Sequence, residues 1–181
     1  MDRWVGRVAI VTGASGGIGA SIAQELVKKD GPVESWKLIL DLNVLALSIC
    51  TKEAIQSMKD SGVDGHIIHI NSTLGHVIPP GDLGLSMYSA SKHAVTALTE
   101  GLRKELVKNN SKIRITSVSP GLVKTDFFTS SGTTPGTPEM MYSTNPHLHP
   151  KDVADCVVFA LSLSPHAQVS ELTLQAVGER F

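Results

Sequence analysis

A glycine-rich turn near the amino terminus limits what this chain can fold into more than any other feature. Residues 12–19 (TGASGGIG) follow a short β-branched apolar run at residues 7–11 and precede a helical pattern at residues 17–29. Glycine allows a sharp turn between strand and helix, and it lets the backbone approach a pyrophosphate that the amides and dipole of the helix start attract. The sequence therefore predicts a buried parallel strand, a phosphate-binding turn and a helix in succession.

The glycines of this turn have the spacing Gly-x-x-x-Gly-x-Gly, formed by Gly13, Gly17 and Gly19, and not the commoner Gly-x-Gly-x-x-Gly. An ordinary tight turn between a strand and a helix is the alternative interpretation. The position at the first predicted strand, directly after Thr12, favours phosphate binding.

The composition indicates one globular domain that covers residues 1–181. The chain is 41% hydrophobic and 18% charged, which is typical of a folded protein and not of a disordered one. The formal charge is −1 and only 4% of residues are aromatic, so the chain lacks the basic footprint and stacking platform of a nucleic-acid-binding protein.

The cysteines and the apolar segments favour a cytoplasmic protein. Cys50 and Cys156 both lie in helical patterns, where we expect reduced thiols and no disulfide. Residues 1–7 lack a secretory signal pattern, and the apolar run at residues 38–50 is too short to cross a membrane.

Strand patterns alternate with helical patterns along the chain. After residues 7–11, strands are predicted at residues 66–70, 113–118 and 171–175, and helices at residues 17–29, 35–60, 87–109 and 151–162. Gly62 is a predicted helix cap, and residues 130–138 contain only Ser, Gly, Thr and Pro, as loops do. This alternation predicts an α/β fold with a largely parallel sheet.

Tyr88 and Lys92 are four residues apart on a predicted helix and therefore share one face. A tyrosine has a pKa near 10, and we expect a neighbouring ammonium and a cationic cofactor ring to lower it. Such a tyrosine exchanges a proton with a substrate oxygen. The alternative is two ordinary surface residues on a helix.

Two polar residues strengthen the catalytic interpretation. Ser72 follows the strand at residues 66–70, at the edge where α/β sheets place their sites, although a serine there also caps loops. Asn43 is an amide inside an apolar helical segment and needs a partner, either at the site or on its own helix. His147 and His149 lack a third ligand nearby, so we expect no metal.

These residues occur in the order found in classical short-chain dehydrogenases/reductases. The chain resembles that family at residues 12–19, at Asn43 and Ser72, in the Tyr88-x-x-x-Lys92 pair and in the Pro-Gly pair at residues 120–121. Residues 1–4, 43–50, 94–103 and 169–179 resemble its farnesol-dehydrogenase-like branch, near dehydrogenase/reductase family member eleven. The resemblance covers nearly the whole chain.

The resemblance implies a role for each matching residue. Tyr88 would be the general acid/base, Lys92 would bind the nicotinamide ribose and lower the tyrosine pKa, Ser72 would orient the substrate, and Asn43 would hold a water in the proton relay. Residues 125–150 would form a substrate lid. The implied cofactor-binding residues are Gly13, Ser15, Gly17, Ile18, Gly19, Tyr88, Lys92, Pro120, Gly121, Val123 and Thr125.

One segment of the family pattern is absent. The family has two further strands, their helices and an Asn-Asn-Ala-Gly strand end where this chain has only the Gly31-Pro32 junction. At about thirty residues per βαβ unit, roughly 60–80 residues are missing. We therefore expect a truncated, Rossmann-like doubly wound parallel sheet, in which the first strand either exposes unpaired backbone or pairs anew.

The resemblance implies an NAD(P)-dependent oxidoreductase that interconverts an alcohol and a carbonyl of prenyl, steroid or small diketone type, with NADP(H) expected over NAD(H). The alternatives are a catalytically impaired isoform that acts only by pairing with an intact subunit, and an incomplete gene model. A homodimer or homotetramer is expected through the helices at residues 35–60 and 87–109, because apolar residues surround most of the first one.

Overall fold

The computed structural model describes residues 10–12, 32–79, 85–127 and 138–179. Its strands are β1 (Ile10–Thr12), β2 (His66–Ile70), β3 (Arg114–Pro120) and β4 (Glu171–Leu174). They form one sheet in the order β1-β2-β3-β4, and every neighbouring pair is parallel. The helices are α2 (Pro32–Leu40), α3 (Leu47–Asp60), α4 (Ser86–Lys108), α6 (Pro138–Thr144) and α7 (Pro150–Ser162), with a π-helical segment η2 (Asp41–Ala46) and a short turn η3 (Thr73–Gly75).

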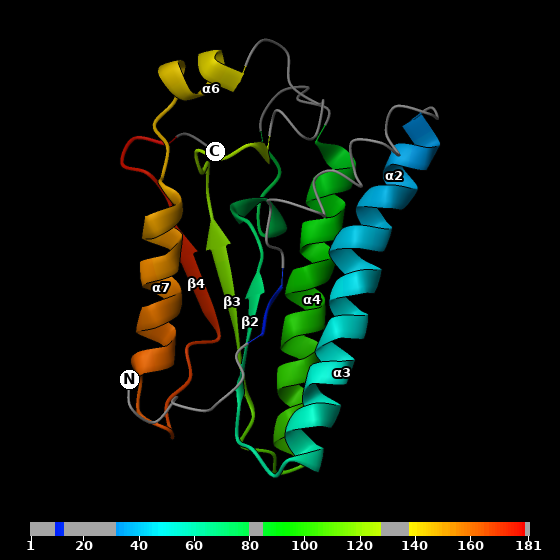
Figure 1. Ribbon diagram of the computed structural model, residues 1–181. Helices are drawn as coiled ribbons and strands as arrows, with labels where there is room; N and C mark the ends of the chain where they lie inside the picture. The colour runs from blue at the N-terminus through cyan, green and yellow to red at the C-terminus, as the bar shows by residue number, and fades with distance from the viewer. Residues whose placement is uncertain (1–9, 13–31, 80–84, 128–137, 180–181) are drawn as a thin grey trace.

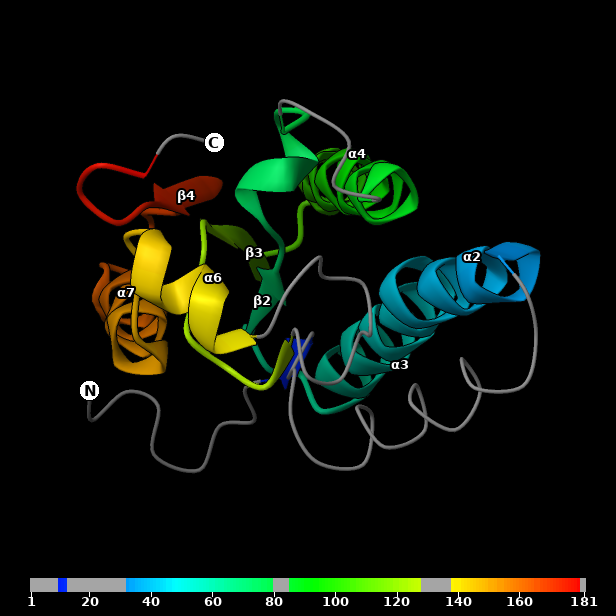
Figure 2. The same cartoon turned by 90° about the horizontal axis from the view of Figure 1, so that it is seen from above.

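Helices cover both faces of the sheet, as Figures 1 and 2 show: α3 and α4 lie on one face and α7 on the other. In β2, Ile67 packs towards α3 and α4, whereas the adjacent Ile68 packs towards α7. This alternation is the two-residue period of a strand, and burial on both faces is typical of a parallel sheet. The α/β fold predicted from the sequence is confirmed.

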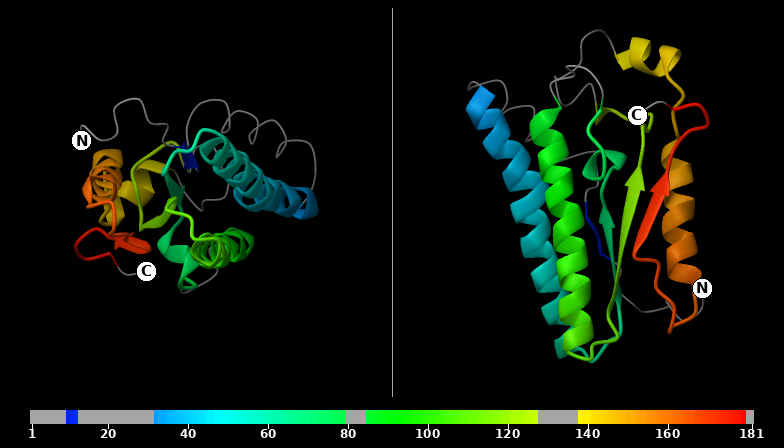
Figure 3. Two further views of the ribbon diagram at one scale, coloured as in Figure 1. Left: turned by 90° about the horizontal axis from the view of Figure 1, so that it is seen from below. Right: turned by 180° about the vertical axis from the view of Figure 1, so that it is seen from behind.

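The helical region before β2 is longer than expected. It begins at Pro32 and continues through α2, η2 and α3 to Asp60. The sequence predicted that it would begin at residue 35. Proline is favoured in a first helical turn because its missing N–H needs no partner there. Figure 3 shows α2 and α3 running beside α4.

Gly62 ends this region as predicted. It has a positive φ of 63°, and its N–H donates to the carbonyl of Lys59 at 3.1 Å. The N–H of Val63 donates to Met58 O at 2.9 Å, which completes a Schellman cap. The cap turns the chain into β2.

The sequence left open whether the first strand would expose unpaired backbone or form a new pairing, and the structure shows a pairing. β1 pairs directly with β2, with Val11 opposite Ile68, although 53 residues separate the two strands in this short chain. The first strand of the chain therefore lies beside the strand that leads to Ser72. Within the described residues β1 has no second neighbour.

The remaining elements also follow the sequence pattern closely. The predicted strands at residues 66–70, 113–118 and 171–175 and the helices at 87–109 and 151–162 all form, within two residues of their expected ends. The helix expected at residues 17–29 and most of the loop expected at 130–138 lie outside the described residues. Among the helices that the structure describes, none has the length and apolar character needed to cross a membrane.

Candidate functional site

Ser72 lies at the carboxyl edge of the sheet, two residues beyond the end of β2. It caps η3: its hydroxyl oxygen accepts the N–H of Leu74 at 3.1 Å. The serine thus performs the loop-capping role that was the alternative interpretation. Its hydroxyl also acts on Tyr88, whose pKa it lowers. Because a hydroxyl both donates and accepts, both roles fit one side chain.

Tyr88 lies in the first turn of α4 and its ring packs against Phe127, with 5.4 Å between ring centroids. Burial raises the pKa of Tyr88 to about 12, and the hydrogen bond from Ser72 opposes this rise. This rise concerns the chain without cofactor, so the expectation that Lys92 and a bound cofactor ring together lower the pKa stays a prediction. Removal from water destabilises the phenolate more than the neighbouring groups stabilise it.

Lys92 is buried one helical turn after Tyr88, and its Nζ lies 5.7 Å from the centre of the tyrosine ring. The ammonium group donates a hydrogen bond to the carbonyl of Ile70 at 3.0 Å. Burial lowers the pKa of Lys92 to about 8, because a charged amine loses hydration inside the protein. Tyr88 and Lys92 therefore lie together on α4, close to the end of β2 that leads to Ser72, and the catalytic role of this cluster stays a prediction.

Asn43 reaches this cluster from η2. Its Nδ2 donates to Ser91 Oγ at 3.0 Å, and Ser91 Oγ donates to the carbonyl of Tyr88 at 2.7 Å. The partner of Asn43 is thus on α4 and not on its own helix. The π-helical segment makes this possible, since it rotates the side chain away from regular α-helical spacing. Such segments occur frequently at functional sites.

The loop after β3 contains the second group of predicted residues. Pro120 ends β3, the N–H of Gly121 donates to Leu174 O at 2.8 Å, and Val123 forms a parallel bridge with Leu148. Tyr142 of α6 donates its hydroxyl to the carbonyl of Thr125 at 2.8 Å. The predicted residues Gly13, Ser15, Gly17, Ile18 and Gly19 lie outside the described part of the chain.

Sequence reasoning missed two side chains that shape the site. Ser91 connects Asn43 to Tyr88 and lies inside the Tyr-x-x-x-Lys pattern. Its position three residues after Tyr88 was the sequence feature that could have identified it. Glu179 accepts the N–H of Leu122 at 2.9 Å and that of Ala176 at 3.1 Å. No local pattern points to Glu179, because its main partner lies 57 residues earlier.

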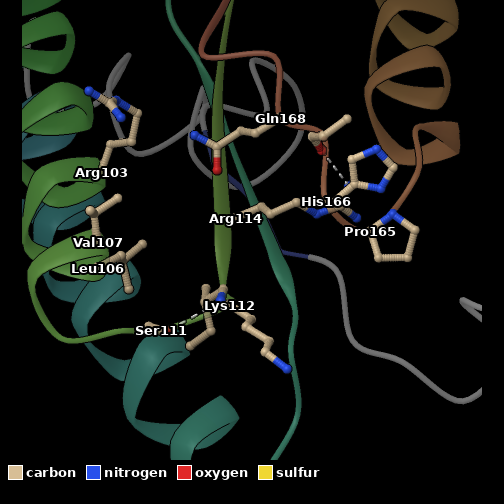
Figure 4. Close-up of a pocket in the computed structure, with 11 residues that line it drawn as sticks. Arg103, Leu106, Val107, Ser111, Lys112, Arg114, Pro165, His166 and Gln168 are labelled. Carbon is tan, nitrogen blue, oxygen red and sulfur yellow. Dashed lines mark hydrogen bonds between the residues drawn. The ribbon is translucent and has the colours of Figure 1, made fainter.

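A pocket at the opposite end of the sheet is separate from this cluster. Figure 4 shows it between the end of α4, the start of β3 and the segment after α7. Two guanidinium groups line it. Arg103 is bonded to Glu100 at 2.6 Å, and Arg114 donates to Ala167 O at 3.1 Å. Active sites of parallel sheets lie at the carboxyl ends of strands, so this pocket is not the substrate site.

Comparison with known proteins identifies the family. A model of the family described as short chain dehydrogenase matches residues 29–136. The mouse (Mus musculus) dehydrogenase/reductase SDR family member 11 is 36% identical over 250 residues, which cover 97% of this chain and 96% of the relative. The chain therefore belongs to the short-chain dehydrogenase family, a family of oxidoreductases.

A second relative supports the narrower assignment. The farnesol dehydrogenase of Aedes aegypti is 33% identical over 257 residues, which cover 100% of both chains. The chain belongs to the branch of these two relatives, as the sequence predicted. Both alignments are longer than the 181 residues of this chain, so each relative has residues without a counterpart here.

A solved structure agrees with this fold. The closed form of serine dehydrogenase complexed with NADP+ superimposes with a TM-score of 0.72 and 29% sequence identity. The match covers 87% of this chain and 62% of that chain. This chain therefore spans less than two thirds of that structure, as expected for a truncated Rossmann-like fold.

Proposed function

We propose that this chain interconverts an alcohol and a carbonyl compound with a nicotinamide cofactor, through Tyr88, Lys92 and Ser72. The observation that carries the proposal is the convergence of these side chains at the carboxyl edge of the sheet. In a parallel sheet this edge is where ligands bind.

The described residues fit such a cofactor. The ammonium group of the buried Lys92 has three donor hydrogens. Among the described residues it donates to Ile70 O. The remaining donors suit the hydroxyl groups of a ribose. Gly121 adds a residue without a side chain at the start of the loop that would face the nicotinamide ring.

Each residue has a distinct task in the proposed reaction. The cofactor supplies or accepts the hydride when it is bound. In carbonyl reduction, Tyr88 donates its hydroxyl proton to the substrate oxygen, and in alcohol oxidation it accepts that proton. Ser72 donates a hydrogen bond that orients the same oxygen. The positive charge of Lys92 stabilises the phenolate, while Asn43 would hold a water in the path that returns the proton.

The narrower features of the proposal come from relatives and from the sequence. A lipophilic prenyl alcohol or its aldehyde is the first substrate class to test, because a relative over the full length is a farnesol dehydrogenase. Steroids and small diketones are the next classes. We propose NADP(H) as the preferred cofactor, supported by the NADP+ complex of a structural neighbour. A cytoplasmic location also remains a prediction.

The direct test is a Tyr88→Phe variant, which keeps the ring and removes only the ionisable hydroxyl. We expect farnesal reduction with NADPH to fall by at least about a hundredfold. Tyr142→Phe is the matched control, because Tyr142 is the other tyrosine and bonds the carbonyl of Thr125. Equal rates for the Tyr88→Phe variant and the unaltered chain, both above background, would reject the assignment.

A second candidate function is an impaired isoform that acts by pairing with an intact subunit; an incomplete gene model remains the third possibility. The chain is much shorter than its alignments with relatives, and β1 pairs directly with β2. Both observations support the idea that part of the cofactor pocket is missing. Each tenfold loss in cofactor affinity corresponds to about 1.4 kcal/mol. This candidate predicts NADPH binding far weaker than micromolar, measured by the fluorescence of the cofactor during titration. Micromolar binding by the purified chain would reject it.

A further inference from the structure

A short hydrogen-bond network ties the Ser72 loop to helix α4. Asn71, only 3% exposed, directly precedes Ser72. Its Nδ2 donates to Thr96 Oγ1 at 2.8 Å, and Thr96 Oγ1 lies 2.9 Å from the carbonyl oxygen of Gly75, to which it donates. Thr96 stands one helical turn beyond Lys92 and two turns beyond Tyr88. One threonine hydroxyl thus contacts both ends of the segment that contains Ser72.

Close packing reinforces this attachment. A Cβ added at Gly75 would lie 2.8 Å from the backbone oxygen of Lys92 and 2.7 Å from the Asn71 side-chain amide. The loop therefore rests on the backbone of α4 at Lys92, with no space for a larger residue. Any sideways movement of the loop would disturb the contacts of Thr96.

The contacts within the loop fix its shape but not its position over the helix. The N–H of Gly75 donates to Ser72 O at 2.9 Å, and Ser72 Oγ accepts from Leu74. The N–H of Asn71 continues the sheet by donating to Val118 O at 2.8 Å. Among the described residues, the Thr96 bonds and the Gly75 packing relate the loop itself to α4, which carries Tyr88, and Lys92 of α4 bonds Ile70 O just before the loop.

The oxygen of the Asn71 side-chain amide strengthens the case. Asn71 Oδ1 is buried and has no hydrogen-bond partner among the described residues. A buried acceptor left unsatisfied lowers stability, so stability alone does not explain an asparagine here. A hydrophobic side chain at this position could not make the bond from Nδ2 to Thr96 that attaches the loop to α4.

We propose that Asn71 and Thr96 are positioning residues, which hold the Ser72 hydroxyl opposite the Tyr88 hydroxyl. Neither touches the reacting atoms. They act through Ser72, which lowers the pKa of Tyr88 and so opposes the larger effect of burial. The catalytic consequence rests on the proposed function, whereas the positioning itself can be observed in the chain without cofactor.

The test uses the two tyrosines of the chain. The protein is labelled with ¹³C at tyrosine Cζ, whose chemical shift reports hydrogen bonding of the hydroxyl, and Tyr142→Phe assigns the two signals. We expect Thr96→Val to move the Tyr88 signal in the same direction as Ser72→Ala, by at least half as much. Thr96→Ser keeps the hydroxyl and should leave the signal in place.

A matched control is Thr144→Val, because Thr144 Oγ1 donates to the carbonyl four residues earlier at 2.7 Å in the exposed helix α6, as Thr96 Oγ1 also does to Lys92 O at 3.2 Å. It should leave the Tyr88 signal unchanged. An unmoved Tyr88 signal in a folded Thr96→Val protein would overturn the proposal. If that variant does not fold, Thr96→Ala gives the same comparison with a smaller side chain.

Activity provides a separate measurement. With farnesal and NADPH, Thr96→Val should lower kcat about tenfold, with the KM for NADPH unchanged, and Thr96→Ser should restore kcat. A parallel loss in Thr144→Val, or an unchanged kcat in Thr96→Val, contradicts the catalytic consequence. An inactive unaltered chain refutes the proposed function, and the tyrosine signals then still decide the positioning.

Discussion

The ammonium nitrogen of the buried Lys92 lies 5.7 Å from the centre of the half-buried Tyr88 ring. This proximity stabilises a phenolate, but burial acts against both charged forms. It raises the pKa of the tyrosine and lowers that of the lysine. Burying these two ionisable groups lowers the stability of the fold, and such a loss is common where buried ionisable groups serve a reaction.

Replacing Lys92 by methionine should therefore stabilise the protein while it removes activity. Methionine is unbranched and only one atom shorter than lysine, and it avoids burying a charge, so we expect unfolding in urea to require about 1 kcal/mol more free energy. The exposed Lys108, on the same helix, provides the control: Lys108→Met should change neither property. A destabilised Lys92→Met protein would mean that the bond to Ile70 outweighs the cost of burial.

The stability of the fold should depend on pH through His69. This buried histidine has Nε2 2.9 Å from Thr51 Oγ1 and Nδ1 2.7 Å from Thr99 Oγ1. Thr99 donates to Val95 O, so it accepts from Nδ1–H, and Thr51 donates to Nε2. Both ring nitrogens of the neutral form are thus used. Burial, together with the charge of Lys92, lowers the pKa of His69 to about 4.

Because the folded pKa lies below the ordinary value near 6.5, the contribution of His69 is complete above pH 6.5 and is lost as the pH falls towards 4. Between pH 7 and pH 5 the free energy of unfolding should decrease by about 2 kcal/mol through this residue. Urea titrations at both pH values measure the loss. His69→Asn should flatten the pH dependence, while substitution of the exposed His93 by glutamine should not.

Gly121 and Glu179 should be energetically coupled. A Cβ at Gly121 would overlap the Glu179 carboxylate, which accepts the N–H groups of Leu122 and Ala176. Gly121→Ala should cost about 1–3 kcal/mol by displacing that carboxylate. In a double-mutant cycle, Gly121→Ala should cost much less in a Glu179→Ala background. Additive losses, measured by chemical unfolding, would show that the two residues act independently.

Association should occur through the outer face of α2, η2 and α3. These three elements expose large apolar side chains in the single chain, at Trp36 (48%), Leu45 (55%) and Ile49 (52%). We expect a dimer or larger assembly, in which the same helices of two copies pair. Leu45→Asp should convert it to a monomer, as measured by light scattering at tens of micromolar.

Leu47, two residues after Leu45, is buried in the core, so its replacement tests folding and not assembly. Val177→Asp is a better control for added charge, because Val177 is 99% exposed and far from these helices in sequence. A stable monomer of the unaltered chain would refute the expected assembly.

The sequence alone predicted the features that depend on near neighbours. A short apolar run located β2, and apolar residues repeating on one helical face located α4 and α7, since these patterns are local properties. The four-residue spacing placed Tyr88 and Lys92 on one helix face, and Gly62 marked a helix end because it accepts a positive φ.

Only the tertiary structure decided which faces meet. It paired β1 with β2, connected Asn43 to Ser91 across 48 residues and brought Glu179 to Leu122 across 57. It also determined that burial outweighs the stabilising neighbours of Tyr88 and raises its pKa. Hydrogen bonds between distant segments and the removal of charges from water depend on the folded arrangement of the whole chain, which no local pattern encodes.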